Sequence, residues 1–292
     1  MTFLNKITSP LGSPIDAALA AAVTLTTLDG DLLDVEKRVI SLFRDEFPPL
    51  GDLNEGGFQI AFDKAVTFVS QNMPAADLNR FSREMLAPVV TLPDQRLALY
   101  GYLYALAMAD LNLDAQETAF LEMIRVAFNL FSVDVETVQN TVLANFRGLH
   151  QALAAAVLGL VIVSADGKVD DSEVQSVQRE RALLEPIAAL NDLQFGLTFD
   201  MALNIHDRFL LDATNRRAFM SDILAQIITQ PTVRLQAFEY AAAVATSDAD
   251  ISSAEIEVMK ELLQTLQISD AQGEQVFNKY MARVRTVDGK PR

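Results

Sequence analysis

Acidic residues recur at one fixed spacing in four places along the chain. In each copy an Asp is followed seven residues later by a Glu, with an apolar residue between them. The first and fourth copies also hold a second Asp two positions after the leading one. The leading and closing pairs are Asp29 with Glu36, Asp110 with Glu117, Asp166 with Glu173, and Asp248 with Glu255. Carboxylate oxygens are the ligands that Ca²⁺ and Mg²⁺ prefer, so these four turns are candidate cation sites.

The pattern matches only the second half of an EF-hand loop, in which a ligand and a turn glycine precede a bidentate Glu. Where the leading Asp of a complete loop would fall, the four copies have apolar residues, namely Leu25, Leu106, Ile162 and Val244. A complete EF-hand is therefore excluded, and a cation site requires two motifs to converge or a neighbouring helix to donate a carboxylate. The third copy has Lys168 in the second ligand position, where an ammonium group opposes a cation. We expect fewer than four sites.

A purely structural interpretation explains part of the same pattern. A residue that caps a helix N-terminus, followed three positions later by Glu, is typical of a capping box, which contributes about 1 kcal/mol to helix stability. The first copy has Leu33 at the capping position, so there the cap is absent or moves to Asp34. The other three copies fit, with the pairs Asp114 and Glu117, Asp170 and Glu173, and Ser252 and Glu255. Capping does not require the leading Asp, so both interpretations remain open.

The spacing of the copies indicates a tandem duplication. The first and third copies are 137 residues apart, and the second and fourth are 138 apart. Other landmarks repeat at the same offsets, including Phe62 with Phe199 and Pro93 with Pro231. Periodic repeats of this kind mark architectures built from copies of one unit. We predict two homologous domains, 1–147 and 148–292, joined near Gly148, each with an internal duplication.

Apolar residues between the motifs follow the helical period. Phe120, Ile124, Ala127 and Phe131 recur at three- and four-residue steps, which predicts one amphipathic helix. The alanine-rich stretch 153–165 reads as a buried helix and is too short to span a bilayer. Tyr-rich 100–104 resembles a strand in composition, but its place before a motif favours a helix. We predict an all-α fold with about six to seven helices in each domain.

The composition excludes several classes of function. The net charge of −16 opposes binding to phosphate backbones, so we expect no nucleic-acid partner. The chain has no Cys, which removes disulfides, zinc–thiolate sites and cysteine nucleophiles. The only two histidines, His150 and His206, are interpreted as surface or helix-end residues rather than catalytic groups. Since no catalytic motif is present either, we expect a protein that is not an enzyme, and a hydrolase with a carboxylate-held metal is a remote alternative.

The C-terminal tail is basic in an otherwise acidic chain. Its cationic residues exceed its single acid, Asp288, by four charges; they are Lys279, Arg283, Arg285, Lys290 and Arg292. Such a tail is able to contact anionic lipid or an acidic partner, although a solvated terminus is the simpler interpretation. The first residues lack the basic start and apolar run of a signal peptide, so we expect a cytoplasmic location.

The stretch from Ala165 to Glu173, Ala-Asp-Gly-Lys-Val-Asp-Asp-Ser-Glu after an alanine-rich helix, resembles the signature of TerB-like domains. These form the tellurite-resistance family, which is also related to the helical N-terminal module of the DjlA co-chaperone. The resemblance covers nearly the whole chain as two tandem domains. It departs from the family pattern at Leu111 and Ala249, which replace the turn glycine, and at Lys168.

The resemblance implies all-helical domains, acidic clusters that bind divalent cations, and a role in stress-response complexes, some of them at membranes. The metal ligands that it implies are Asp29, Asp31, Glu36, Asp110, Glu117, Asp166, Glu173, Asp248, Asp250 and Glu255. Two hypotheses follow. In the first, the protein binds Ca²⁺ or Mg²⁺ in a stress response; in the second, it is a helical scaffold or co-chaperone-type module whose motifs only shape helix corners. A protein partner is expected in either case, and no other cofactor is.

Overall fold

The computed structural model describes residues 10–28, 30, 32–72, 77–111, 113–165, 171–247 and 251–287, without the side chains of 171–173, 193 and 283–287. Every regular element within these ranges is helical, which confirms the all-α prediction. Contacts along the chain divide it into two compact units, 1–145 (unit 1) and 146–292 (unit 2). Each unit is considered by itself.

Unit 1 begins with an alanine-rich helix and contains two short elements, η1 (Arg44–Glu46) and α3 (Pro48–Gly51), that make a corner before the longest helix. The π-helical η2 (Phe81–Leu86) continues α5. The remaining helices are α1 (Pro14–Thr26), α2 (Asp34–Leu42), α4 (Glu55–Asn72), α5 (Leu78–Arg80), α6 (Pro93–Ala107), α7 (Ala115–Phe128) and α8 (Ser132–Asn145).

Unit 2 repeats this order, with η3 (Glu180–Leu183) and α11 (Glu185–Ala188) at the matching corner. Its π-helical segments η4 (His206–Leu210) and η5 (Phe219–Leu224) extend α12 and α13. The other helices are α9 (Arg147–Val163), α10 (Asp171–Arg179), α12 (Asp192–Ile205), α13 (Ala213–Ala218), α14 (Ala225–Ile227), α15 (Pro231–Ala245), α16 (Ser253–Thr265) and α17 (Asp270–Val287). When continuous segments are joined and the corners set aside, each unit has seven helices among the described residues, as predicted.

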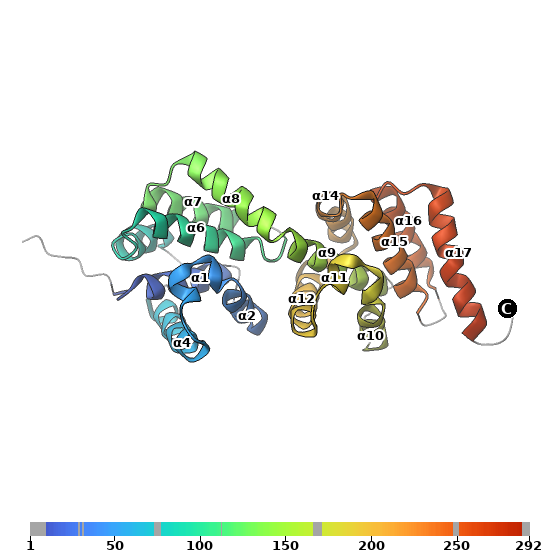
Figure 1. Ribbon diagram of the computed structural model, residues 1–292, viewed down its shortest axis with the longest axis horizontal. Coiled ribbons are helices and arrows are strands. Elements are labelled where there is room, and N and C mark those ends of the chain that lie inside the picture. The colour runs from blue at the N-terminus through green and yellow to red at the C-terminus, as the bar shows by residue number, and fades with distance from the viewer. Residues whose placement is uncertain are drawn as a thin grey trace, which may run out of the picture. The chain divides into compact units, whose positions relative to one another are not determined.

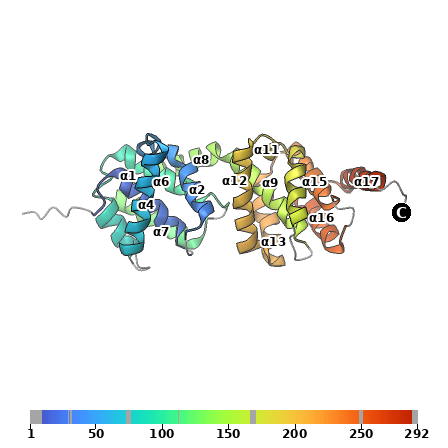
Figure 2. The same ribbon diagram turned by 90° about the horizontal axis from the view of Figure 1, so that it is seen from below.

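A helix buried on every side forms the centre of each unit. In unit 2, α9 packs against α10, α11, α12 and α15. Both ribbon views show α9 between α12 and α15 (Figures 1 and 2). Residues 152–163 of α9 are all buried, and residues 17–25 of α1 are buried in the same way. Small alanine side chains let the neighbouring helices approach the axis of such a helix closely. The predicted buried helix at 153–165 is therefore confirmed as α9.

The described helices differ from membrane-spanning ones in length and composition. None of these is by itself long and apolar enough to cross a bilayer; α8 and α9 reach that length and composition only when taken together across a bend.

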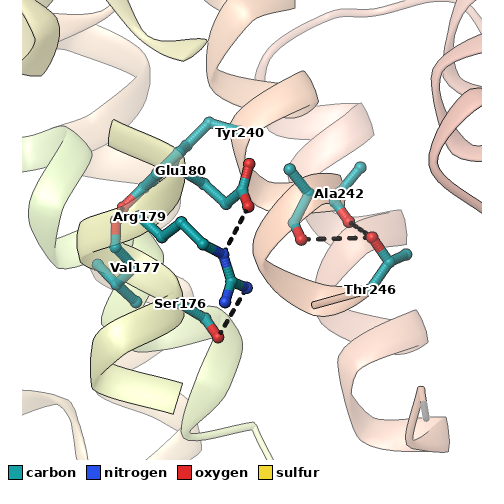
Figure 3. A network of polar contacts seen from close by, with 8 residues as sticks. Ser176, Val177, Arg179, Glu180, Tyr240, Ala242 and Thr246 are labelled. Carbon is teal, nitrogen blue, oxygen red and sulfur yellow. Dashed lines mark hydrogen bonds and ion pairs between the residues drawn. The ribbon is translucent and has the colours of Figure 1, made fainter. Parts of the chain in front are cut away.

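One tyrosine hydrogen bond is present in both units. The Tyr102 hydroxyl donates to the Ile40 carbonyl at 3.2 Å, and the Tyr240 hydroxyl donates to the Val177 carbonyl at 3.3 Å. Both rings are fully buried, and burial raises the pKa of both phenols far above the usual value. The bond ties the second alanine-rich helix of each unit to the helix after its first motif (Figure 3).

A second set of contacts repeats at the corner before the long helix. The Arg44 guanidinium pairs with Glu55 at 2.9 Å and lies 5.6 Å from the ring centroid of Phe58. In unit 2, Arg181 pairs with Asp192 at 2.6 Å and lies 4.6 Å from the ring centroid of Phe195. Each ring stacks on a second one, at 6.1 Å for Phe58 on Phe62 and 5.8 Å for Phe195 on Phe199. These matched contacts support the predicted duplication in three dimensions.

Two local predictions have different outcomes. The Tyr-rich segment 100–104 is helical, within α6, as expected. The helix predicted to run through Phe131 is wrong at its end, because α7 stops at Phe128 and Asn129 adopts the left-handed conformation at φ 56°. Phe131 consequently lies beyond the helix, and its side chain is 70% exposed.

Replacing Gly159 by Ala tests the packing around α9. An added Cβ would lie 2.5 Å from Tyr240 Oη and 2.8 Å from Val177 Cγ1. Because both neighbours are buried, we expect overpacking to lower the unfolding free energy of unit 2 by about 1–3 kcal/mol, measured by urea denaturation followed by circular dichroism. Gly196→Ala in α12 is the control, since a Cβ there meets nothing within 4 Å. Equal stability of the two variants would contradict this account.

Candidate functional site

The four acidic motifs lie at equivalent corners of the fold. Each connects an alanine-rich helix to an amphipathic one, at the junctions α1–α2, α6–α7, α9–α10 and α15–α16. The closing Glu is the third residue of the second helix in every copy. This position directs a Glu side chain back toward the first turn, where backbone N–H groups lack partners within the helix.

Capping geometry is present in both of the predicted boxes that the structure describes. In the second copy, the Asp114 N–H donates to Glu117 Oε2 at 3.0 Å, and the Glu117 N–H donates to Asp114 Oδ1 at 2.8 Å. In the fourth copy, the corresponding distances between Ser252 and Glu255 are 2.7 Å and 3.1 Å. The third predicted box, formed by Asp170 and Glu173, lies outside the described side chains.

The first copy has only half of a capping box. The Leu33 N–H donates to Glu36 Oε2 at 2.7 Å, but the Leu33 side chain has no atom that accepts a hydrogen bond in return. Asp34 does not take over the cap, because it is the first residue of α2. Its carboxylate instead pairs with Lys37 at 2.7 Å, and this ammonium lowers the pKa of Asp34. The predicted loss of the side-chain cap is therefore confirmed, and its predicted transfer to Asp34 is not.

Most of the predicted cation ligands fall outside the described residues. These are Asp29, Asp31, Asp166, Asp248 and Asp250, together with the side chain of Glu173. The described ligands are Glu36, Asp110, Glu117 and Glu255, and all four are half-buried. Within the described ranges, no three His, Asp or Glu side chains come together in a way that would hold a metal ion.

The second motif keeps a sharp turn without a glycine. Leu111 has φ 68°, in the left-handed region that non-glycine residues seldom adopt, and its side chain is buried. Such a conformation costs on the order of 1–3 kcal/mol and persists where the surrounding structure enforces it. Burial of the Leu111 side chain in the core offsets this cost, which explains how the copy tolerates the missing glycine.

The two histidines lie at helix ends, as predicted, but the expectation that they are at the surface is wrong. His150 is 7% exposed near the start of α9, and His206 is 1% exposed at the end of α12. His206 Nδ1 lies 3.0 Å from Asp207 Oδ1, while its Nε2 has no hydrogen-bond partner in the described part of the chain. The apolar residues around them in the sequence mark both positions as core-facing, a signal that residue type alone does not carry.

Unit 2 contains a groove that the sequence analysis missed. It has a volume of about 400 Å³ and lies between α15 and α17, lined by Leu235, Glu239, Gln272, Gln275, Val276 and Lys279. In unit 1 the position matching Glu239 is Gly101, where a Cβ would be only 2.9 Å from Val138 Cγ1. The absence of a side chain thus lets α8 lie against α6, whereas Glu239 occupies the matching place in unit 2 and pairs with Lys279 at 3.0 Å. When the two halves of the sequence are aligned, the pairing of Gly101 with Glu239 is the sequence signal for this groove.

Two units with the same helix order, the same arginine–phenylalanine corner and the same tyrosine bond define an all-α protein built by tandem duplication. The family model of the tellurite resistance protein TerB matches the chain twice, over residues 16–140 and 152–278. The chain therefore belongs to the TerB family, with one domain in each unit. No curated protein and no solved structure gives a significant match.

Changes at the helix caps are expected to shift stability in opposite directions. Ser252→Ala removes an N-cap acceptor from α16 and should lower the free energy of unfolding of unit 2 by about 1 kcal/mol. Leu33→Ser completes the box at α2 and should raise that of unit 1 by about 0.5–1 kcal/mol, partly offset by lost apolar contact. Both effects are measured by chemical denaturation.

Ser253→Ala is the matched control for the α16 cap. Ser253 is an exposed residue at the first helical position, beside the N-cap. If it destabilises unit 2 as much as Ser252→Ala does, the capping role assigned to Ser252 is wrong.

Proposed function

We propose that this TerB-family protein is not an enzyme and that it binds divalent cations of the Ca²⁺ or Mg²⁺ type at its motif corners. The observation that supports this is the direction of the closing carboxylates. Glu36, Glu117 and Glu255 each accept a hydrogen bond from the N-cap N–H, at 2.7–3.0 Å. Each carboxylate is thereby held at the N-terminal end of its helix, directly after the motif turn. Together with the leading Asp seven positions earlier in the sequence, it would offer a cation oxygen ligands from both ends of one motif.

The first and fourth corners are the strongest candidates. Each supplies two Asp and one Glu in its own motif, in the order Asp29, Asp31 and Glu36, and Asp248, Asp250 and Glu255. The second corner has Asp110 and Glu117 with Asn112 between them, and the third, with Asp166 and Glu173, has the opposing Lys168. We expect the protein to act in the cytoplasm, in a stress-response complex or against a basic protein surface. The net charge of −16 opposes binding to nucleic acid, which is therefore not expected as a partner.

The second candidate function is a helical scaffold whose motifs only shape corners. Its support is the same set of hydrogen bonds, because capping by itself accounts for the position of the three Glu side chains. In this alternative the leading Asp residues are solvated, and the protein acts by presenting helical surfaces to a partner. Cation-dependent stability separates the two candidates.

Thermal unfolding of chelator-treated protein, with and without millimolar Ca²⁺, Mg²⁺ or Mn²⁺, tests cation binding. An ion present at about 100 times its Kd should add about 2.7 kcal/mol to the unfolding free energy of the unit that binds it. We expect a higher midpoint for the natural chain, and no shift for the double variant Asp29→Ala/Asp248→Ala.

The control is Asp63→Ala/Asp222→Ala, which removes the same charge from two exposed positions outside the motifs. It should retain the cation effect. If no ion moves the midpoint of any of the three proteins, cation binding is refuted and the motifs are helix corners only. If the control loses the shift as well, the effect is general screening of acidic charge.

A further inference from the structure

Three large apolar side chains are exposed at one end of unit 1. Leu92 is 57% exposed, Phe131 70% and Val133 66%. Leu92 is the N-cap of α6, while Phe131 and Val133 lie at the start of α8. We refer to these three residues as the unit 1 end patch.

An arginine brings the two loops that carry the patch together. Arg96, one turn into α6, donates from Nη1 to the Phe128 carbonyl at the end of α7, at 3.2 Å. Its Nε and Nη2 donate to the carbonyls of Val90 and Ala87, at 2.7 Å and 3.2 Å. The start of α6 is therefore tied to the end of α7, so Leu92 and the segment that carries Phe131 and Val133 lie at the same end of unit 1.

The other unit shows that this fold does not require an apolar end patch. Unit 2 has a similar arginine, Arg234, which donates from Nε to the Ile228 carbonyl and from Nη1 to Gln267 Oε1, both at 3.0 Å. At the positions that match Leu92, Phe131 and Val133, however, it carries Gln230, Ser269 and Ala271. Single exposed apolar residues are common on protein surfaces. Three of them at one end of unit 1, with polar or small residues at the matching positions of unit 2, indicate a binding surface.

The patch is bordered by negative charge. Asp94 follows Leu92 by two positions, and Asp134 and Glu136 follow Val133; all three are exposed. None of the three forms an ion pair with another described residue. Asp94 and Asp134 each stand in the first turn of a helix, whose positive end offsets only about half a charge. At the matching positions unit 2 has Thr232 and Gln272 in place of Asp94 and Asp134. It keeps an acid, Glu274, in place of Glu136 and has Asp270 where unit 1 has Ser132, so it carries two acids here against three in unit 1.

We propose that the unit 1 end patch docks a basic amphipathic helix of a partner protein. Such a helix presents apolar residues on one stripe, which would cover Leu92, Phe131 and Val133, and cationic residues on its flanks, which would meet Asp94, Asp134 and Glu136. Burying a side chain the size of Phe or Leu from water is strongly favourable, so the apolar residues supply affinity and the acidic border supplies orientation. This inference is independent of cation binding at the motif corners.

The test measures binding of a fluorescent model peptide by anisotropy. The probe is an idealised helix of about five turns with leucine on one face and lysine on the other. The variant Leu92→Gln/Phe131→Ser/Val133→Ala installs the residues that unit 2 carries and should weaken binding at least about tenfold. Ile60→Gln is the control, because Ile60 is 74% exposed on α4 outside the patch, and it should bind as the natural chain does.

Two further arms examine charge and self-association. A peptide with the same leucine face but glutamate in place of lysine should not bind measurably, and Asp94→Asn/Asp134→Asn should weaken binding of the lysine peptide several-fold and reduce its salt dependence. Unchanged binding by the triple variant, no binding by the natural chain, or equal binding of the two peptides would overturn the proposal. Sedimentation that shows a dimer lost only in the triple variant would also overturn it, since the occupant would then be a second copy of this chain.

Discussion

Each unit depends on a helix that has no solvent-facing side. The residues of α1 and α9 are buried over two or more turns, so every neighbouring helix must contribute an apolar face, and the approach distance is set by alanine side chains. Since all the backbone hydrogen bonds of a helix are internal, it tolerates complete burial at little polar cost. The helices α2, α7 and α16, each of which follows a motif, are amphipathic because they have one face on the interior and the other in water. Residues 99–107 of α6 and 240–245 of α15 are buried throughout, as in the central helices. The motif turns occur where the chain leaves the interior, which is why their acidic residues stand beside the most apolar segments of the sequence.

The sequence allowed the all-α class, the duplication, the two capping boxes and the buried helix at 153–165 to be predicted, because each rests on local periodicity or on a repeated spacing. The end of α7 was missed, since the apolar period continues to Phe131 while the left-handed Asn129 ends the helix. Burial of His206 was missed because residue type alone does not reveal it; the signal lies in the apolar residues beside it in the sequence. The groove beside Glu239 in unit 2 depends on how closely α15 and α17 approach each other. In unit 1 the matching residue is Gly101, and its missing side chain lets α6 and α8 come into contact.

Duplication has allowed the two units to diverge at their surfaces while their interiors stay alike. The buried tyrosine bond and the stacked phenylalanines are kept in both, since each stabilises the core. The exposed positions differ in kind: unit 1 has an apolar end patch where unit 2 is polar, and unit 2 has a groove where the helices of unit 1 are in contact. Because each core is conserved in kind, the surface of one unit can change without changing the fold of the other.

The absence of tryptophan gives the buried tyrosines a spectroscopic consequence. Ultraviolet emission of this chain comes from its five tyrosines, three of them in unit 1 and two in unit 2. Tyr102 and Tyr240 occupy matching sites, and the hydroxyl of each donates a hydrogen bond to a helix carbonyl. Each phenol is therefore in an environment that differs from that of a phenol in water. Each unit thus contains its own intrinsic fluorophore at the centre of its fold. Exchange of both tyrosines of unit 2, Tyr240 and Tyr280, for phenylalanine leaves only the three tyrosines of unit 1 as emitters, so the unfolding of unit 1 can be followed by itself without any added label.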